Sequence, residues 1–140
     1  MILPDVNVLI YAFRADSPHH ERCRAWLTSI VLGGPRFGLS SLVLSAVIRI
    51  TTSPRIFRTP SSLEEAFGFC EDLTSQPHAE AIEPGARHWD IFRRLCLDTA
   101  TQGPRTTDAW LAALAIESGC EWITLDRDFA RFPGLRWAAP

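Results

Sequence analysis

MILPDVNVLIYAF, residues 1–13, decides the fold of this chain. Its apolar residues Ile2 and Leu3 lead directly to Asp5, and a second apolar run fills residues 8–13. A short apolar run of this kind is typical of a buried strand, and we expect a turn after Asp5 that leads into a short helix. The stretch therefore predicts a buried first strand that ends at a carboxylate, among residues that otherwise belong in a core.

The length of the chain predicts one compact domain over residues 1–140, because 140 residues can bury most of their apolar surface around a single core. The 4 cysteines stand far apart without a C-x-x-C pair, and no secretory leader opens the sequence. We therefore expect reduced, buried thiols in a cytoplasmic protein. No charge-free apolar run has the length of a bilayer span, so membrane insertion is not expected.

The charged residues limit the classes of function. A formal net charge of −2 argues against a nucleic-acid grip spread over the whole surface, so any such grip must be local. All 14 basic residues are arginine, which excludes chemistry that needs a lysine amine. Genomic base composition can explain this bias, although arginine is also the better bidentate partner for phosphate.

The rest of the chain alternates short strands with helices. Turn and cap signals predict helices over 18–33, from Ser40 or Ser41 to about 51, over 63–74 with a capping box, from Pro84 to about 102, and from Thr106 or Thr107 to Gly119. Strands are expected over 37–39, 79–82 and 120–125. This alternation predicts an α/β fold with a short, mostly parallel central sheet flanked by helices.

Three acids stand where ligands bind in such folds, beyond the carboxyl ends of the strands. Asp5 and Asp126 follow predicted strands, and Asp108 lies in the first turn of a predicted helix. Carboxylates brought close together must share protons or be neutralised by a cation, and oxygen ligands favour Mg²⁺ or Mn²⁺. In that case Asn7 orients a water and Thr124 supports a carboxylate.

Each acid also has a purely structural interpretation. Asp5 and Asp126 can cap turns, and Asp108 can be an ordinary N-terminal helix charge. Asp128 can cap a short helix over 129–131 instead of binding metal or water. The 4 histidines lack zinc spacing and are expected at the surface, whereas the 5 tryptophans are expected mainly in the core.

Three motifs in order, DVNVLIYA (5–12), TDAWLAALAIESG (107–119) and TLDRDFARFPGLRW (124–137), resemble those of PIN-domain ribonucleases, and more narrowly those of VapC toxins. The resemblance covers nearly the full length. It implies a single PIN-like domain and a metal-dependent endoribonuclease, in which water activated by Mg²⁺ or Mn²⁺ cuts RNA to leave a 3′-hydroxyl and a 5′-phosphate. It also implies a homodimer and a cognate antitoxin that blocks the site, commonly by presenting an arginine to the acids.

Carried over by position, the resemblance makes Asp5 and Asp108 the principal metal ligands. Asp126 would complete the catalytic site, with Asn7 and Thr124 in support. The family usually carries a glutamate on the helix after Ser40-Ser41, but Ser45-Ala46-Val47 holds no acid there. Water, a substrate phosphate or Asp128 would then take its place. The segment VIRITTSPRIF (47–57) resembles a branch in which this departure is a regular feature, which favours activity.

Arginines offer two candidate edges for an RNA channel. Arg49 and Arg55, together with Arg58, would form one edge, and Arg127 and Arg131 the other. The same arginines can instead be solvated or contact the antitoxin.

Other enzyme classes fit less well. A haloacid-dehalogenase-type phosphatase needs a second aspartate at the position of Asn7 and a lysine, and a response-regulator receiver also needs a lysine. The remaining rival is a catalytically silent PIN module that binds RNA or a protein partner, and the missing glutamate is its main support.

Overall fold

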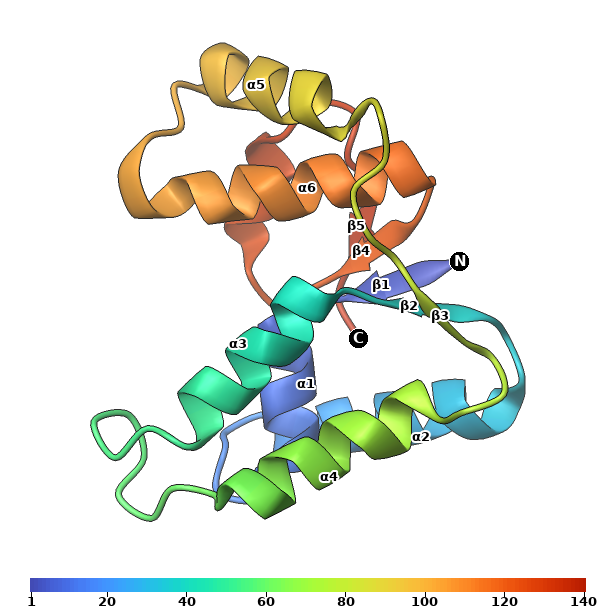
Figure 1. Cartoon of the computed structure of the whole chain (residues 1–140), viewed down its shortest axis with the longest axis vertical. Coiled ribbons are helices and arrows are strands. Elements are labelled where there is room, and N and C mark those ends of the chain that lie inside the picture. The colour runs from blue at the N-terminus through green and yellow to red at the C-terminus, as the bar shows by residue number, and fades with distance from the viewer.

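The central sheet has five short parallel strands, and the computed structural model describes all residues 1–140. The strands are β1 (Ile2–Pro4), β2 (Phe37–Leu39), β3 (Ala79–Ala81), β4 (Glu121–Ile123) and β5 (Trp137–Ala138), in the order β3-β2-β1-β4-β5 (Figure 1). Leu3 of β1 pairs with Trp122 of β4, and Ile2 pairs with Phe37 of β2. Because β1 lies centrally and every strand is parallel, the residues that follow β1, β2 and β4 meet at one edge.

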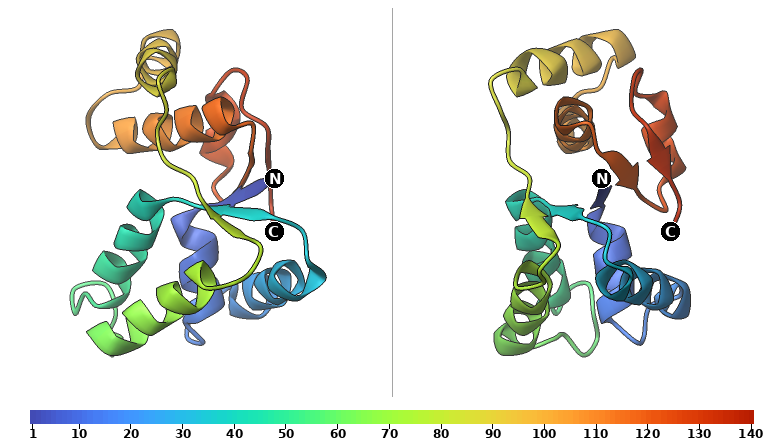
Figure 2. Two further views of the ribbon diagram at one scale, coloured as in Figure 1. Left: turned by 45° about the vertical axis from the view of Figure 1, so that its right-hand side comes forward. Right: turned by 90° about the vertical axis from the view of Figure 1, so that its right-hand side faces the viewer.

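Six α-helices cover the two faces of this sheet. They are α1 (Val6–Phe13), α2 (His20–Gly33), α3 (Ser41–Thr51), α4 (Leu63–Thr74), α5 (His88–Thr99) and α6 (Thr106–Ser118), with short 3-10 helices η1 (Gly103–Arg105) and η2 (Arg127–Arg131). Helices α5 and α6 lie on one side of the sheet and α1 to α4 on the other, as both views in Figure 2 show. None of the helices combines the length and apolarity that a membrane span requires.

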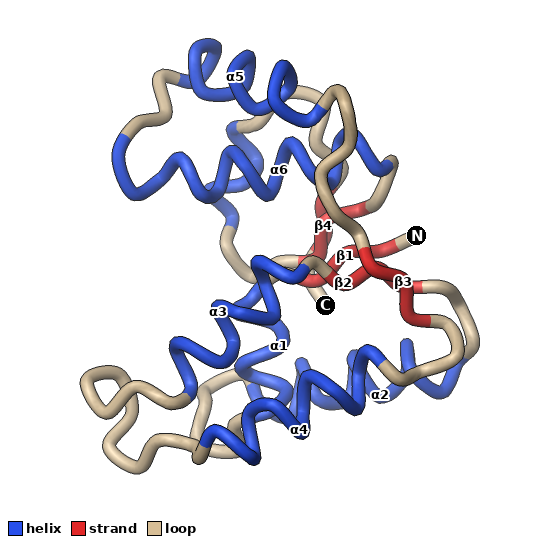
Figure 3. The backbone as a smooth tube through the Cα atoms, viewed as in Figure 1, coloured by secondary structure: helices blue, strands red, loops and turns tan.

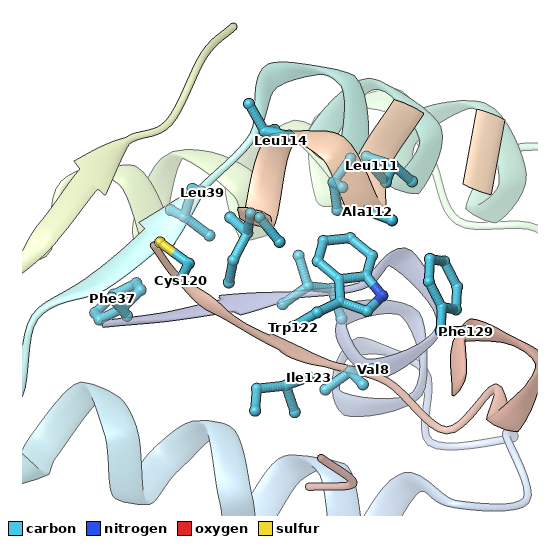
Figure 4. Close-up of a cluster of buried hydrophobic side chains, with 14 of the residues drawn as sticks. Val8, Phe37, Leu39, Leu111, Ala112, Leu114, Cys120, Trp122, Ile123 and Phe129 are labelled. Carbon is cyan, nitrogen blue, oxygen red and sulfur yellow. The ribbon is translucent and has the colours of Figure 1, made fainter. Parts of the chain in front are cut away.

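The core fills both sides of β1 and β4. Trp122 of β4 is fully buried and points toward Leu111 and Leu114 of α6, whereas Ile123 and Val8 lie on the opposite side (Figure 4). Helix α6 buries an almost unbroken run from Leu111 to Ala115, since it lies between the sheet and α5. This packing fixes the N-terminal end of α6, which carries Asp108, relative to the strand ends.

Most predicted elements are present with small shifts at their ends. The capping box at α4 is confirmed, since the Glu65 amide donates to Ser62 Oγ at 3.1 Å and the Ser62 amide donates to Glu65 Oε1 at 3.3 Å. Gly119 ends α6 as predicted, in the left-handed region at φ 71° that glycine adopts readily. The cysteines are free, and three of the four are buried.

Two local predictions were wrong, and one strand was missed. The fifth helix starts at His88 and not at Pro84, because the Glu117 carboxylate accepts from the amides of Gly85 and Arg87, both at 2.8 Å, and holds that segment as a turn. His88, expected at the surface, is buried with its Nε2 3.0 Å from the Trp110 carbonyl. Strand β5 has only two residues and was not predicted.

The longest loop is formed by residues 52–62 between α3 and α4 (Figure 3). It is held by the buried side chain of Arg14. Arg14 follows α1 and donates to Ser61 Oγ at 3.0 Å and to the Thr59 carbonyl at 2.8 Å. Its guanidinium also pairs with Asp16 and lies 4.0 Å from the centroid of the Phe57 ring. Nothing in the sequence pattern marked Arg14 as buried.

Candidate active site

The three acids predicted as a site lie at the same edge of the sheet. Asp5 follows β1 directly, and Asp126 comes three residues after the end of the neighbouring strand β4. Asp108 lies in the first turn of α6, which leads back along the sheet into β4. The crossover geometry of parallel strands therefore brings carboxylates from three distant segments together.

Asp5 is the buried centre of this arrangement, with 4% of its surface exposed. Its Oδ1 accepts from the Val6 amide at 2.6 Å, which caps α1, and its Oδ2 accepts from Thr124 Oγ1 at 2.6 Å. Burial raises the pKa of Asp5 to about 6 against these two stabilising hydrogen bonds, and the charges of Asp108 and Asp126 raise it further. Asp5 therefore lies close enough to both other acids to sense their charge.

Thr124 joins the strand end of β4 to Asp5. Its buried hydroxyl donates to Asp5 and accepts from Asn7 Nδ2 at 3.2 Å and from the Asp126 amide at 3.0 Å. Asn7 Nδ2 also donates to Asp5 Oδ2 at 3.1 Å, and Asn7 Oδ1 accepts from the Leu125 amide at 3.4 Å. Asn7 and Thr124 thus lie where the sequence predicted them, beside Asp5, and they fix the rotamer of its carboxylate.

Asp108 is half-buried and has an arginine partner. Arg131 places its guanidinium 3.4 Å from Asp108 Oδ2, donates to the Asp128 carbonyl at 2.9 Å, and lies 4.3 Å from the centroid of the Phe132 ring. The pKa of Asp108 is raised, chiefly by burial; the Arg131 hydrogen bond and charge oppose the rise, and Asp126 adds to it. The structure therefore sets one positive charge against the acids at this end of the site.

Asp126, and not Asp128, caps the short helix η2. Asp126 caps η2 by accepting from the Asp128 amide at 2.9 Å, so the expectation that Asp128 caps this helix was wrong. Asp128 is exposed, and its carboxylate lies 2.7 Å from a guanidinium nitrogen of Arg105. That partner was missed, because Arg105 and Asp128 are distant in sequence and no motif connects them.

The three carboxylates are chemically suited to a hard divalent cation, but they do not surround a common point. All the candidate ligands are oxygen atoms. The charges of Asp108 and Asp126 raise the pKa of Asp5, and that of Asp126 raises the pKa of Asp108, a repulsion that a divalent cation relieves. No group of three His, Cys, Asp or Glu side chains lies close enough together to hold a metal ion. The Ser40 hydroxyl, at the end of the adjacent strand β2, is buried without a hydrogen-bond partner.

The two arginines predicted to bind RNA lie outside the acid cluster. Arg49 lines a groove between α3 and α4, and Arg55 is exposed in the loop 52–62. Neither forms an ion pair with Asp5, Asp108 or Asp126. Their role in RNA binding stays a prediction.

Comparisons with known proteins agree with this architecture. A family model described as PIN domain matches residues 2–135. Ribonuclease VapC25 of Mycobacterium tuberculosis is 41% identical over 140 residues, covering 100% of this chain and 99% of the relative. Ribonuclease VapC33 of the same organism is 39% identical, covering 100% of this chain and 98% of the relative.

Solved structures show the same fold at lower identity. A chain of the VapBC2 complex from Rickettsia felis, bound to a DNA fragment from its promoter, aligns with a TM-score of 0.71 at 19% identity, covering 99% of this chain and 98% of that one. VapC20 of M. tuberculosis, described as a Sarcin-Ricin loop cleaving toxin, aligns with a TM-score of 0.68 at 17% identity, covering 97% and 99%. From the match over residues 2–135 and the full-length relatives at 41% identity, the chain belongs to the PIN-domain family, within the group of VapC ribonucleases.

Proposed function

We propose that this chain is a divalent-metal-dependent endoribonuclease that acts as the toxin of a toxin–antitoxin pair. The observation that carries the proposal is the hydrogen-bonded carboxylate of Asp5, buried at a strand end within electrostatic reach of Asp108 and Asp126. Burying an ionisable group is costly, and such groups are concentrated at functional sites. The ribonuclease relatives that match the full chain supply the substrate class.

In this proposal Asp5, Asp108 and Asp126 hold Mg²⁺ or Mn²⁺. A bound divalent cation would supply an activated water and offset the charge of a phosphodiester. Thr124 and Asn7 hold the Asp5 carboxylate in one orientation and keep a hydrogen bond on its charged form, so that it is available as a ligand at neutral pH.

In this proposal Arg131 first offsets the charge of Asp108 and then binds the substrate phosphate. Its guanidinium offsets part of the charge of Asp108, and its packing over Phe132 limits its motion. When a cation takes Asp108, the donors of Arg131 become free for a phosphate oxygen, which guanidinium groups bind well. Asp128, held by Arg105, is then a supporting charge at the rim and not a principal ligand.

A protein partner follows from the same family context. The solved neighbours include VapBC assemblies, and we propose a cognate antitoxin and a homodimeric toxin for this chain as well. An antitoxin that reaches Asp108 must displace or bypass Arg131, because that guanidinium already lies on the carboxylate.

The decisive test is cleavage of RNA by purified protein with Mg²⁺ or Mn²⁺, with the new ends mapped. Asp5→Ala and Asp108→Asn are expected to abolish cutting, whereas Asp72→Ala, which removes an exposed carboxylate of α4, is expected to cut like the wild type. The products should carry 3′-hydroxyl and 5′-phosphate ends. Inducible expression should arrest growth for the wild type and not for Asp5→Ala.

The silent binding module keeps one observation in its favour, the lack of three acids close enough to share a metal. It predicts RNA or protein binding without turnover in any metal. Undiminished cleavage by Asp5→Ala would refute the enzymatic proposal, because contaminating nuclease would then be the source of the activity. RNA binding without any metal-dependent cutting would favour the binding module.

A further inference from the structure

Beside the acids lies a cavity of about 640 Å³ that the proposed chemistry does not use. It is bounded by the N-terminal part of α2, by η2, and by the ends of β4 and β5 with the C-terminal tail. The tail ends next to α2, where Arg22 Nε donates to the Pro140 carbonyl at 2.9 Å (Figure 2). The volume of the cavity falls within the range of about 300–1,000 Å³ that is typical of ligand pockets.

The lining of this cavity carries the positive charge of two arginines. It includes Arg22, Arg127 and His19, and it contains no Asp or Glu. Arg105 and Arg131 are paired with carboxylates, whereas Arg127 has no carboxylate partner. Arg22 bonds only through Nε to a carbonyl, which leaves the other donors of its guanidinium free. The cavity is therefore equipped for an anion.

The cavity and the acid site share one segment of backbone. Thr124 and Leu125 line the cavity, and Thr124 also donates to Asp5 while Leu125 donates to Asn7. The cavity therefore adjoins the acid site through this segment. Trp137, half-buried in the wall, offers an aromatic surface on which a base can stack.

We propose that this cavity is the subsite for the single-stranded RNA segment next to the cleaved bond, with Arg22 and Arg127 binding successive phosphates. The inference rests on the proposed ribonuclease function. An RNA strand fits better than an acidic peptide, because the cavity adjoins the phosphodiester-cutting site and because one wall is aromatic. The arginines give backbone affinity and no sequence preference, since phosphate contacts carry none.

Binding in EDTA separates this subsite from catalysis, because no divalent cation is present to support cutting. The probe is a fluorescein-labelled single-stranded RNA of mixed sequence, titrated by anisotropy at several salt concentrations. Arg127→Gln and Arg22→Gln are each expected to weaken binding roughly tenfold and to lower the slope of log Kd against log salt by about 0.7. Arg24→Gln, on α2 but outside the cavity, is the matched control and should change neither quantity.

Parallel cleavage assays with Mg²⁺ show which idea fails. Unchanged RNA affinity and salt slope in the Arg22→Gln/Arg127→Gln double variant would overturn the subsite, even if the wild type cuts RNA. Hexaglutamate serves as an acidic-peptide probe in the same assay. If the double variant loses hexaglutamate binding but keeps its RNA affinity, the cavity binds an acidic peptide and the RNA subsite is overturned. If the wild type never cuts RNA but the double variant loses RNA affinity, the subsite stands and the enzymatic proposal falls. If the wild type cuts RNA, we expect the double variant to have a raised KM and a nearly unchanged kcat.

Discussion

Replacing Asp5 by asparagine should make the metal-free protein more stable at neutral pH. Asp5 is 4% exposed and its pKa is raised to about 6 from an ordinary 3.8, chiefly by burial. A carboxyl whose pKa is higher in the folded state binds its proton more tightly there. Its favourable contribution is therefore complete below pH 3.8 and disappears as the pH rises through about 6. Above that pH the buried negative charge of Asp5 is a net cost to the folded state.

The pKa values give the size of the effect. The gap between 3.8 and about 6 corresponds to roughly 3 kcal/mol at neutral pH, at about 1.4 kcal/mol per pH unit. About 2 kcal/mol of this penalty develops between about pH 4.5 and about pH 7.5, because Asp5 is then changing from mostly protonated to mostly ionised in the folded protein. Asparagine lacks the charge, although it cannot accept every hydrogen bond that Asp5 accepts; that loss of about 1 kcal/mol is nearly independent of pH.

Thermal unfolding in EDTA at the two pH values measures the difference directly. The melting temperature of Asp5→Asn relative to wild type should rise by roughly 4–8 °C on going from about pH 4.5 to about pH 7.5. Asp16→Asn is a control, because the Arg14 hydrogen bond lowers the pKa of Asp16 below its ordinary 3.8: the contribution of Asp16 is lost only at lower pH, so its removal should have nearly the same effect at both pH values. If the melting temperature of Asp5→Asn relative to wild type is the same at both pH values, or is lower at the higher pH, the raised pKa of buried Asp5 is refuted.

Three further outcomes follow from particular contacts. Thr124→Val removes the hydroxyl that favours ionised Asp5, so the acidic limb of the pH profile of cleavage should move up by about one to two pH units; an unmoved limb would contradict this role. Arg131→Gln should raise the Mn²⁺ affinity measured by calorimetry, because the guanidinium no longer competes for Asp108, and a lowered affinity would exclude competition. Glu117→Gln should lower the free energy of unfolding by about 1 kcal/mol in urea titrations, because the charge that caps two amides before α5 is lost.

Local signals in the sequence predicted most of the fold, because each acts over a few residues. The capping box at Ser62, the left-handed glycine at Gly119 and the apolar run into Asp5 give bounds close to those observed. The errors arise where distant groups override local preference. Pro84 is suited to begin a helix, but Glu117, 32 residues from Gly85, binds the neighbouring amides and delays it. The two-residue strand β5 exists only because its main chain pairs with β4.

The site divides in the same way. Parallel crossovers make it possible to infer from sequence that Asp5, Asp108 and Asp126 lie at the same edge of the sheet, and the inference needs only the strand ends. The arginine partners could not be inferred, because the pairs Arg105–Asp128 and Arg131–Asp108 depend on the path of η2 past α6.

The chain segment that follows β4 separates the negative charges from the positive charges at this edge of the sheet. Residues 124–126 run between the acid cluster, near α6, and the cationic cavity, near α2. The Thr124 hydroxyl donates to the Asp5 carboxylate, and the same residue lines the cavity. Movement of this segment on RNA binding must therefore change the hydrogen bond that favours the ionised form of Asp5. If Asp5 holds the metal as we propose, we expect substrate binding and metal affinity to be coupled through Thr124, and by linkage each should strengthen or weaken the other by the same factor.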